Sequence, residues 1–172
     1  WEEEGRTAVV VGTAAGVEGI IAVADTLRPA GPEAVAALQR LGIATVMLTG
    51  DNRYTAARIA EQVGVSDVRA ELLPADKVTA IRELQQTTPV AMVGDGVNDA
   101  PAMATASVGI AMGVAGTDVA LETADVALMG DELAQLPPAV QLARKTLTII
   151  RQNIPVSLLV KAVFLVLTFV GV

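Results

Sequence analysis

The chain has 172 residues, of which 52% are hydrophobic, 18% charged and 2% aromatic, and its formal net charge is −7. This hydrophobicity excludes a disordered chain, and the acidic balance gives no basic patch for nucleic-acid binding. Because the chain contains no Cys and no His, it excludes a disulfide framework, a zinc site of the usual Cys and His ligands, and Ser-His-Asp or papain-like catalysis.

The first part of the chain predicts a pair of strands. Residues 7–12 and 19–24 are rich in Val, Ile and Ala, and we expect a turn between them at residues 16–19. The sequence before these strands, WEEE, has neither the basic start nor the apolar core of a signal peptide.

From residue 25 the pattern changes to strands that alternate with helices. The predicted helices are residues 32–41, 54–63, 75–86, 100–105 and 118–123, and the predicted strands are residues 45–48, 68–72, 90–93, 108–112 and 126–129. Such alternation implies an α/β fold with a doubly wound parallel sheet. In these sheets ligands bind at the carboxyl ends of the strands.

The last part of the chain predicts one long helix that continues into an apolar segment. Residues 132–152 have a helical pattern, which leaves open a break near Pro137 and Pro138. Residues 154–172 carry one charge, Lys161, and are long enough to cross a hydrocarbon layer of about 30 Å. Because this segment has no polar residues after it, we expect the chain to be a fragment of a longer protein.

The sequence GDGVNDAP, residues 94–101, follows a predicted strand. Asp95 and Asp99 are four residues apart and could direct their carboxylates at one hard cation, with Asn98 as a neutral ligand. A small number of carboxylates is how proteins hold Mg²⁺ next to a phosphate. The alternative is that these residues only cap the next helix.

Two other segments offer polar groups that could bind an anion. In MLTGDN, residues 47–52, Thr49 and Gly50 offer a hydroxyl and backbone N–H groups to an anion, although an ordinary turn capped by Asp51 or Asn52 would have the same sequence. Lys77 lies in the first turn of a predicted helix, where the helix dipole disfavours a cation. It is therefore either solvated or directed at an anion. Together these groups suit a transferring phosphoryl group, but a nucleophile is missing.

Four segments, in this order and spacing, resemble the phosphorylation domain of P-type ATPases. They are DTLRP (25–29), MLTGDN (47–52), LLPADK (72–77) and GDGVNDAPAM (94–103). The resemblance implies a haloacid-dehalogenase-like, Rossmann-type fold. The segment GVEGIIAVADTLRP and the apolar tail are similar to the heavy-metal-transporting branch of these ATPases.

The resemblance also implies roles for single residues. Thr49 and Gly50 would contact an aspartyl phosphate and Lys77 would stabilise its charge. Asp95 would bind Mg²⁺, supported by Asn98 and Asp99. Asp51 would lie near the phosphates or ribose of ATP, and Asp25 and Arg28 would help to join two domains.

The implied domain plan is as follows: residues 1–24, the end of a nucleotide-binding domain and a hinge; 25–131, the phosphorylation domain without its acceptor-Asp segment; 132–152, a stalk helix; 153–172, a truncated transmembrane helix. The family's phosphate acceptor motif, Asp-Lys-Thr-Gly-Thr, does not occur in the chain. We expect it upstream, with six membrane helices and a Cys-Pro-x motif, so the chain alone should not hydrolyse ATP.

Lys161 bears on the transported metal. A Lys within a membrane segment is costly and therefore a functional candidate, although it could instead extend to the membrane surface. Copper-type members usually carry Tyr-Asn here, whereas Val160-Lys161 resembles the zinc, cadmium and lead exporters. The resemblance thus implies part of an ATP- and Mg²⁺-dependent exporter of these metals in the bacterial plasma membrane, with residues 1–150 in the cytoplasm. The alternatives are a copper-type ATPase and a soluble phosphatase-like module.

Overall fold

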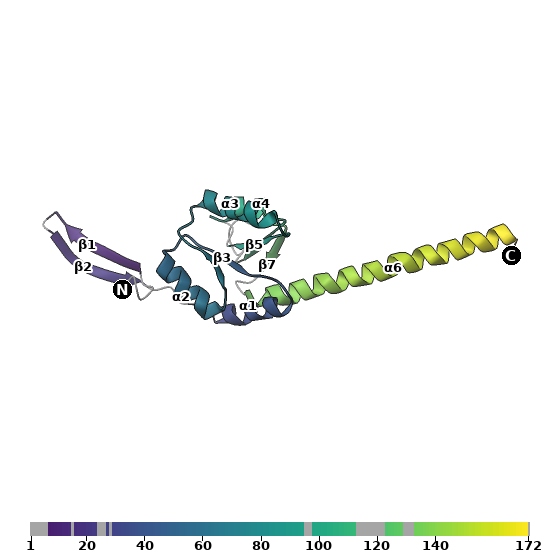
Figure 1. Cartoon of the computed structure of the whole chain (residues 1–172), viewed down its shortest axis with the longest axis horizontal. Coiled ribbons are helices and arrows are strands. Elements are labelled where there is room, and N and C mark those ends of the chain that lie inside the picture. Colours follow the sequence, from purple (N-terminus) through teal and green to yellow (C-terminus); the bar gives the residue numbers. More distant parts are fainter. Residues whose placement is uncertain are drawn as a thin grey trace. The chain divides into compact units, whose positions relative to one another are not determined.

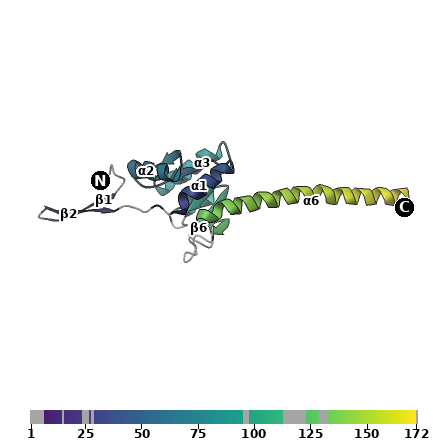
Figure 2. The ribbon, with the colours of Figure 1, turned by 90° about the horizontal axis from the view of Figure 1, so that it is seen from below.

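A computed structural model describes residues 7–14, 16–23, 27, 29–94, 98–112, 123–128 and 133–171. The chain divides into two compact units, Trp1–Gln135 and Leu136–Val172, which Figures 1 and 2 show from two directions. Three predicted site residues, Asp25, Arg28 and Asp95, lie outside the described residues, as does most of the predicted helical turn at 118–123.

The predicted strand pair is an antiparallel hairpin of β1 (Thr7–Thr13) and β2 (Gly16–Val23). The predicted turn at residues 16–19 is wrong, because Gly16 already pairs with Thr13 and begins β2. Gly16 adopts a φ of 142°, a conformation that only glycine reaches easily. The glycine therefore starts the second strand, whereas the prediction placed it in the turn.

The rest of the first unit alternates strands with helices. The helices are α1 (Ala30–Arg40), α2 (Arg53–Val63), α3 (Pro74–Gln85) and α4 (Ala100–Thr105), and the strands are β3 (Val46–Leu48), β4 (Asp67–Arg69), β5 (Ala91–Gly94), β6 (Val108–Met112) and β7 (Val126–Leu128). All pairings among these strands are parallel, in the order β3-β4 and β5-β6-β7. The predicted α/β class with parallel strands is confirmed; the described hydrogen bonds form two separate ladders.

The helix boundaries follow from local signals that the sequence carries. Asn52 caps α2 by accepting a hydrogen bond from the Thr55 N–H to Oδ1 at 2.9 Å. Helix α3 begins at Pro74, and the Asp76 carboxylate accepts the Leu73 N–H at 2.9 Å. Proline and an acceptor side chain suit this first turn, where backbone N–H groups have no helical partner.

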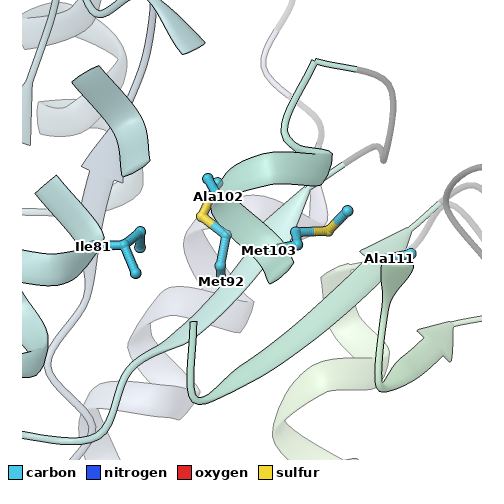
Figure 3. Close-up of a cluster of buried hydrophobic side chains, with 5 residues drawn as sticks. All are labelled: Ile81, Met92, Ala102, Met103 and Ala111. Carbon is cyan, nitrogen blue, oxygen red and sulfur yellow. The ribbon is translucent and has the colours of Figure 1, made fainter. Parts of the chain in front are cut away.

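A cluster of buried side chains joins α3, β5, α4 and β6 (Figure 3). Its members are Ile81, Met92, Ala102, Met103 and Ala111. Ile81 and Met103 are 2% and 1% exposed. Leu48, at the end of β3, and Val78, in α3, also pack against this cluster. Thr49 and Lys77 are the chain neighbours of these two residues, so the same core positions the backbone of both.

The second unit is the helix α6 (Leu136–Val170), preceded by a short 3₁₀ turn, Leu133–Gln135. The helix is not broken at Pro137 and Pro138. Instead it begins there, because a proline in the first turn removes no helical hydrogen bond. The helical segment Leu133–Val166 is long and apolar enough to cross a membrane, with a mean hydropathy of 1.6.

Candidate functional site

The loop after β3, residues 49–51, is held by the segment that follows β4. The Thr49 N–H donates to the Arg69 carbonyl at 3.0 Å, and the Thr49 carbonyl accepts the Leu72 N–H at 3.0 Å. The Asp51 carbonyl accepts the Glu71 N–H at 2.8 Å. Backbone bonds to both sides therefore fix the position of this loop, which we call the Thr49 loop.

The side chains of the Thr49 loop bond to each other. The Thr49 hydroxyl donates to Oδ2 of Asp51 at 2.8 Å and accepts the Asp51 N–H at 3.1 Å. Of the two residues that could cap the next helix, Asn52 does so, which leaves the exposed Asp51 carboxylate to the loop. Thr49 and Asp51, predicted to contact different parts of the substrate, thus form one hydrogen-bonded turn.

Lys77 and Asp99 form an ion pair that is largely shielded from water. Lys77 Nζ lies 2.7 Å from Oδ1 of Asp99, and the two side chains are 14% and 16% exposed. The interpretation of Lys77 as a solvated surface lysine is therefore wrong. A charge-assisted bond of this length in a shielded position is strong and directional, so it fixes the ammonium group near the end of β5.

Asp99 rests against the backbone of Gly94, the last residue of β5. A Cβ atom on Gly94 would lie 2.7 Å from Cβ of Asp99 and 2.9 Å from its Oδ2. Asp99 precedes α4 but makes no capping bond to it with its side chain. For Asp99 the helix-capping alternative is therefore wrong: the carboxylate points at Lys77, and glycine at position 94 gives it room.

The structure thus brings the predicted residues together in two groups. The Thr49 loop lies against residues 69–72, and Lys77 lies against Asp99. The two groups are linked by the short connection from Leu72 to α3 and by the core cluster on which Leu48 and Val78 pack. Asn98 is exposed beside Asp99, and Lys161 is exposed in the second unit.

The donor atoms near Lys77 suit magnesium in kind. Mg²⁺ is usually held by one or two carboxylates together with substrate phosphates, and Asp99 and Asn98 supply such oxygen atoms. Among the residues that the structure describes, no three Asp, Glu, His or Cys side chains form a metal-binding group. One oxygen of Asp99 is already bonded to Lys77, so Asp99 supports the lysine, and Asp95 stays a predicted ligand.

The segment 69–72 is part of the site that the sequence did not reveal. Besides its backbone bonds, it makes two ion pairs, Arg69 with Glu83 at 2.7 Å and Glu71 with Arg53 at 3.0 Å. Glu71 has a φ of 60°. Nothing in the sequence LLPADK or its surroundings signals a left-handed conformation at a glutamate.

The chain is similar to several known proteins. A profile of the haloacid dehalogenase-like hydrolases matches residues 1–107. The chain is 54% identical, over 172 residues and 99% of its length, to a probable cadmium-transporting ATPase of Alkalihalophilus pseudofirmus. It is 52% identical, over 99% of its length, to a cadmium-transporting ATPase of Staphylococcus aureus. In both comparisons the match covers 24% of the relative.

The chain is also similar to a solved structure. The crystal structure of a zinc-transporting PIB-type ATPase in the E2·Pi state superposes with a TM-score of 0.85 and 52% sequence identity. The match covers 99% of this chain and 28% of that structure. The chain therefore spans about a quarter of the length of the proteins that it matches.

Proposed function

We propose a function from the premise that this chain belongs to the haloacid dehalogenase-like hydrolase family. In this proposal the chain is part of an ATP-driven transporter of zinc, cadmium or lead, and it supplies the residues that stabilise an aspartyl phosphate. The observation that carries the proposal is the identity of 52–54%, over 99% of the chain, to proteins named as cadmium-transporting ATPases. Two further observations support it: the shielded Lys77–Asp99 pair, and the packing of Leu48 and Val78, the neighbours of Thr49 and Lys77, on one core cluster.

The chemistry assigned to these residues is charge stabilisation during phosphoryl transfer. An acceptor carboxylate outside this chain attacks the γ-phosphorus of ATP, the bond to the β-phosphate oxygen breaks, and ADP leaves. Negative charge on the transferred group requires fixed donors and cations. Lys77 supplies the cation, held in place by Asp99. The Thr49 hydroxyl reaches a phosphoryl oxygen by rotating away from Asp51, and the backbone at Gly50 approaches the same group.

Magnesium is the cofactor that this chemistry implies, and Asp95 with Asn98 would hold it. Bound there, the ion neutralises charge on the phosphoryl oxygens. We expect Asp95→Ala to raise the Mg²⁺ concentration for half-maximal phosphoenzyme by at least about a hundredfold, because a carboxylate ligand is lost. Titration of the full-length protein with Mg²⁺ measures this. Asp67→Ala, at an exposed position of β4, is the control, and an unchanged Mg²⁺ requirement in Asp95→Ala would remove Asp95 from the site.

The substrate class rests on the membrane helix and its lysine. Helix α6 has the length and composition to cross a membrane, and Lys161 lies in its apolar part. We propose that this Lys is a counter-charge near the transported divalent metal. Lys161→Ala is expected to change metal-stimulated turnover at least about threefold, because ionisable residues within membrane segments mark the paths of transported ions.

Comparison with Lys145→Ala, a lysine of the same helix before its apolar part, controls for general damage to α6. Turnover would be measured with zinc, cadmium, lead and monovalent copper. Equal stimulation of Lys161→Ala and the unmodified protein by all four metals would mean that Lys161 only extends to the membrane surface. Stimulation by copper alone would favour the copper-type alternative.

The experiment that tests the function begins with the coding sequence upstream of Trp1. We expect an in-frame Asp-Lys-Thr-Gly-Thr motif and membrane segments, and a full-length product that is labelled by γ-³²P-ATP on an acid-stable, hydroxylamine-sensitive bond. Labelling should depend on zinc, cadmium or lead. Two results together would instead support the soluble phosphatase-like alternative. They are unrelated sequence upstream of Trp1 and a phosphatase activity that zinc, cadmium and lead do not stimulate.

A further inference from the structure

We propose that Glu71 is a positioning residue for phosphoryl transfer, and that it acts through its left-handed backbone conformation and not through its carboxylate. The inference rests on the proposed function and adds a residue to it. Among the residues that the structure describes, Glu71 alone combines a positive φ, 60°, with a side chain other than glycine's hydrogen.

This conformation is unfavourable for a glutamate on its own. The left-handed region brings Cβ close to the backbone, and residues other than Gly, Asn and Asp visit it rarely. Such a residue persists where its surroundings determine the conformation, and these positions cluster at functional sites. At Glu71 the surroundings are the Thr49 loop.

Two hydrogen bonds connect the left-handed turn to that loop. The Glu71 N–H donates to the Asp51 carbonyl at 2.8 Å, and the Leu72 N–H donates to the Thr49 carbonyl at 3.0 Å. The two acceptors lie on either side of Gly50, whose Cβ position is 3.3 Å from the Leu72 carbonyl oxygen. Residues 71 and 72 therefore hold the loop on both sides of Gly50, the backbone that the proposed function assigns to the phosphate.

The turn at Glu71 makes these bonds possible. Strand β4 runs parallel to β3 and ends at Arg69. If the chain stayed extended beyond Arg69, the parallel ladder would place the Glu71 N–H at the Thr49 carbonyl, whereas here the Leu72 N–H takes that place and the Glu71 N–H reaches the Asp51 carbonyl. The left-handed residue bends the chain back across the loop, and Pro74 then begins α3, which carries Lys77. One backbone conformation thus sets both the loop and the start of the helix with the catalytic lysine.

The Glu71 carboxylate contributes little to this arrangement. It pairs with Arg53 at 3.0 Å, but the two side chains are 49% and 82% exposed. Ion pairs at such exposure contribute little, because water and salt screen them. Glu71 thus has two separate features, its backbone conformation and the charge of its carboxylate. Different substitutions at position 71 can test each of them.

The test uses the full-length protein with three substitutions at one position. Glu71→Val places a β-branched side chain in the left-handed region, Glu71→Gly removes the steric conflict, and Glu71→Gln keeps the shape without the charge. Glu61→Val, at an exposed position of α2, is the matched control. Hydrogen exchange of the peptide containing residues 71 and 72, followed by mass spectrometry, reports on the loop, and phosphoenzyme formation reports on the chemistry.

For Glu71→Val we expect exchange at least about tenfold faster and phosphoenzyme formation at least about tenfold slower, because a β-branched residue resists this conformation. Glu71→Gly and Glu71→Gln should stay within about twofold of the unmodified protein, since glycine adopts this φ freely. Glu61→Val should resemble the unmodified protein. Recovery in the glycine variant is the result that a role of the side chain would not produce.

Several results would overturn the proposal. Normal exchange and labelling in Glu71→Val would mean that the conformation is unimportant, and loss of labelling in Glu71→Gln would mean that the carboxylate matters. If Glu71→Val does not fold, the glycine and glutamine variants still decide between backbone and side chain. Absence of phosphoenzyme in the unmodified protein would contradict the proposed function itself, whereas the exchange rates would still test whether residue 71 holds the loop.

Discussion

Lys77→Ala in the full-length protein is expected to slow phosphoenzyme formation by at least about a thousandfold. The substitution removes a fixed cation from the site of charge development, and the loss of one preorganised donor alone costs about a hundred- to a thousandfold. It also leaves the carboxylate of Asp99, 16% exposed, without its partner. We therefore expect the free energy of unfolding to fall as well, by about 2–3 kcal/mol.

Two further variants separate the chemical effect from the effect on stability. Asp99→Asn breaks the same ion pair but keeps the lysine, so it should lose comparable stability and less activity than Lys77→Ala. Lys77→Arg keeps the charge with a different shape and should lie between them. Urea unfolding and rapid-quench labelling measure the two quantities. If Lys77→Ala and Asp99→Asn lost activity equally, Lys77 would serve the fold and not the phosphoryl group.

Gly94→Ala should have the second largest effect. The new Cβ would lie 2.7 Å from Cβ of Asp99 and 2.9 Å from its Oδ2, well inside van der Waals contact, and both atoms are held close to the backbone. Asp99 or the Gly94 backbone must therefore shift, which disturbs the bond between Asp99 and Lys77. We expect a loss of about 1–3 kcal/mol in the free energy of unfolding, as for other overpacked sites, and a fall in phosphoenzyme formation of at least about thirtyfold.

Gly19→Ala provides the matched control, because a Cβ at that position meets nothing within 4 Å. It should leave unfolding and labelling unchanged. A further test combines Gly94→Ala with Asp99→Gly, which removes both the colliding Cβ and the carboxylate. Part of the stability lost through Gly94→Ala should then return. If both glycine variants behaved alike, the Gly94 position would tolerate a side chain and the close approach of Asp99 would have no consequence.

The sequence predicted the elements well where local chemistry decides them. Each described helix of the α/β unit begins and ends within two residues of its prediction, because prolines, cap residues and glycines mark these boundaries. The predicted strand at 68–72 is too long because tertiary bonds bend the chain at Glu71. No local pattern reveals that bend. The predicted turn at 16–19 was wrong because glycine is typical of turns but can also be the first residue of a strand, as Gly16 is here.

The site shows the same division. The residue types in GDGVNDAP and MLTGDN predict phosphate and magnesium chemistry, and this stays a prediction. The pairing within the site was not predictable: Lys77 and Asp99 are 22 residues apart, and either could have been a solvated side chain. The strand positions and the core cluster bring them together. The roles of all the predicted site residues stay predictions, and Asp25, Arg28 and Asp95 also lie outside the described residues.

Helix α6 contains a proline, Pro155, at the start of its apolar part. Because proline has no N–H, the carbonyl of Arg151 receives no hydrogen bond from the position four residues later. A helix bends most easily where such a bond is missing, so we expect Pro155 to be the joint at which α6 bends. Bending at this joint costs no further hydrogen bond. It would let the apolar half change its tilt while the first half keeps its direction.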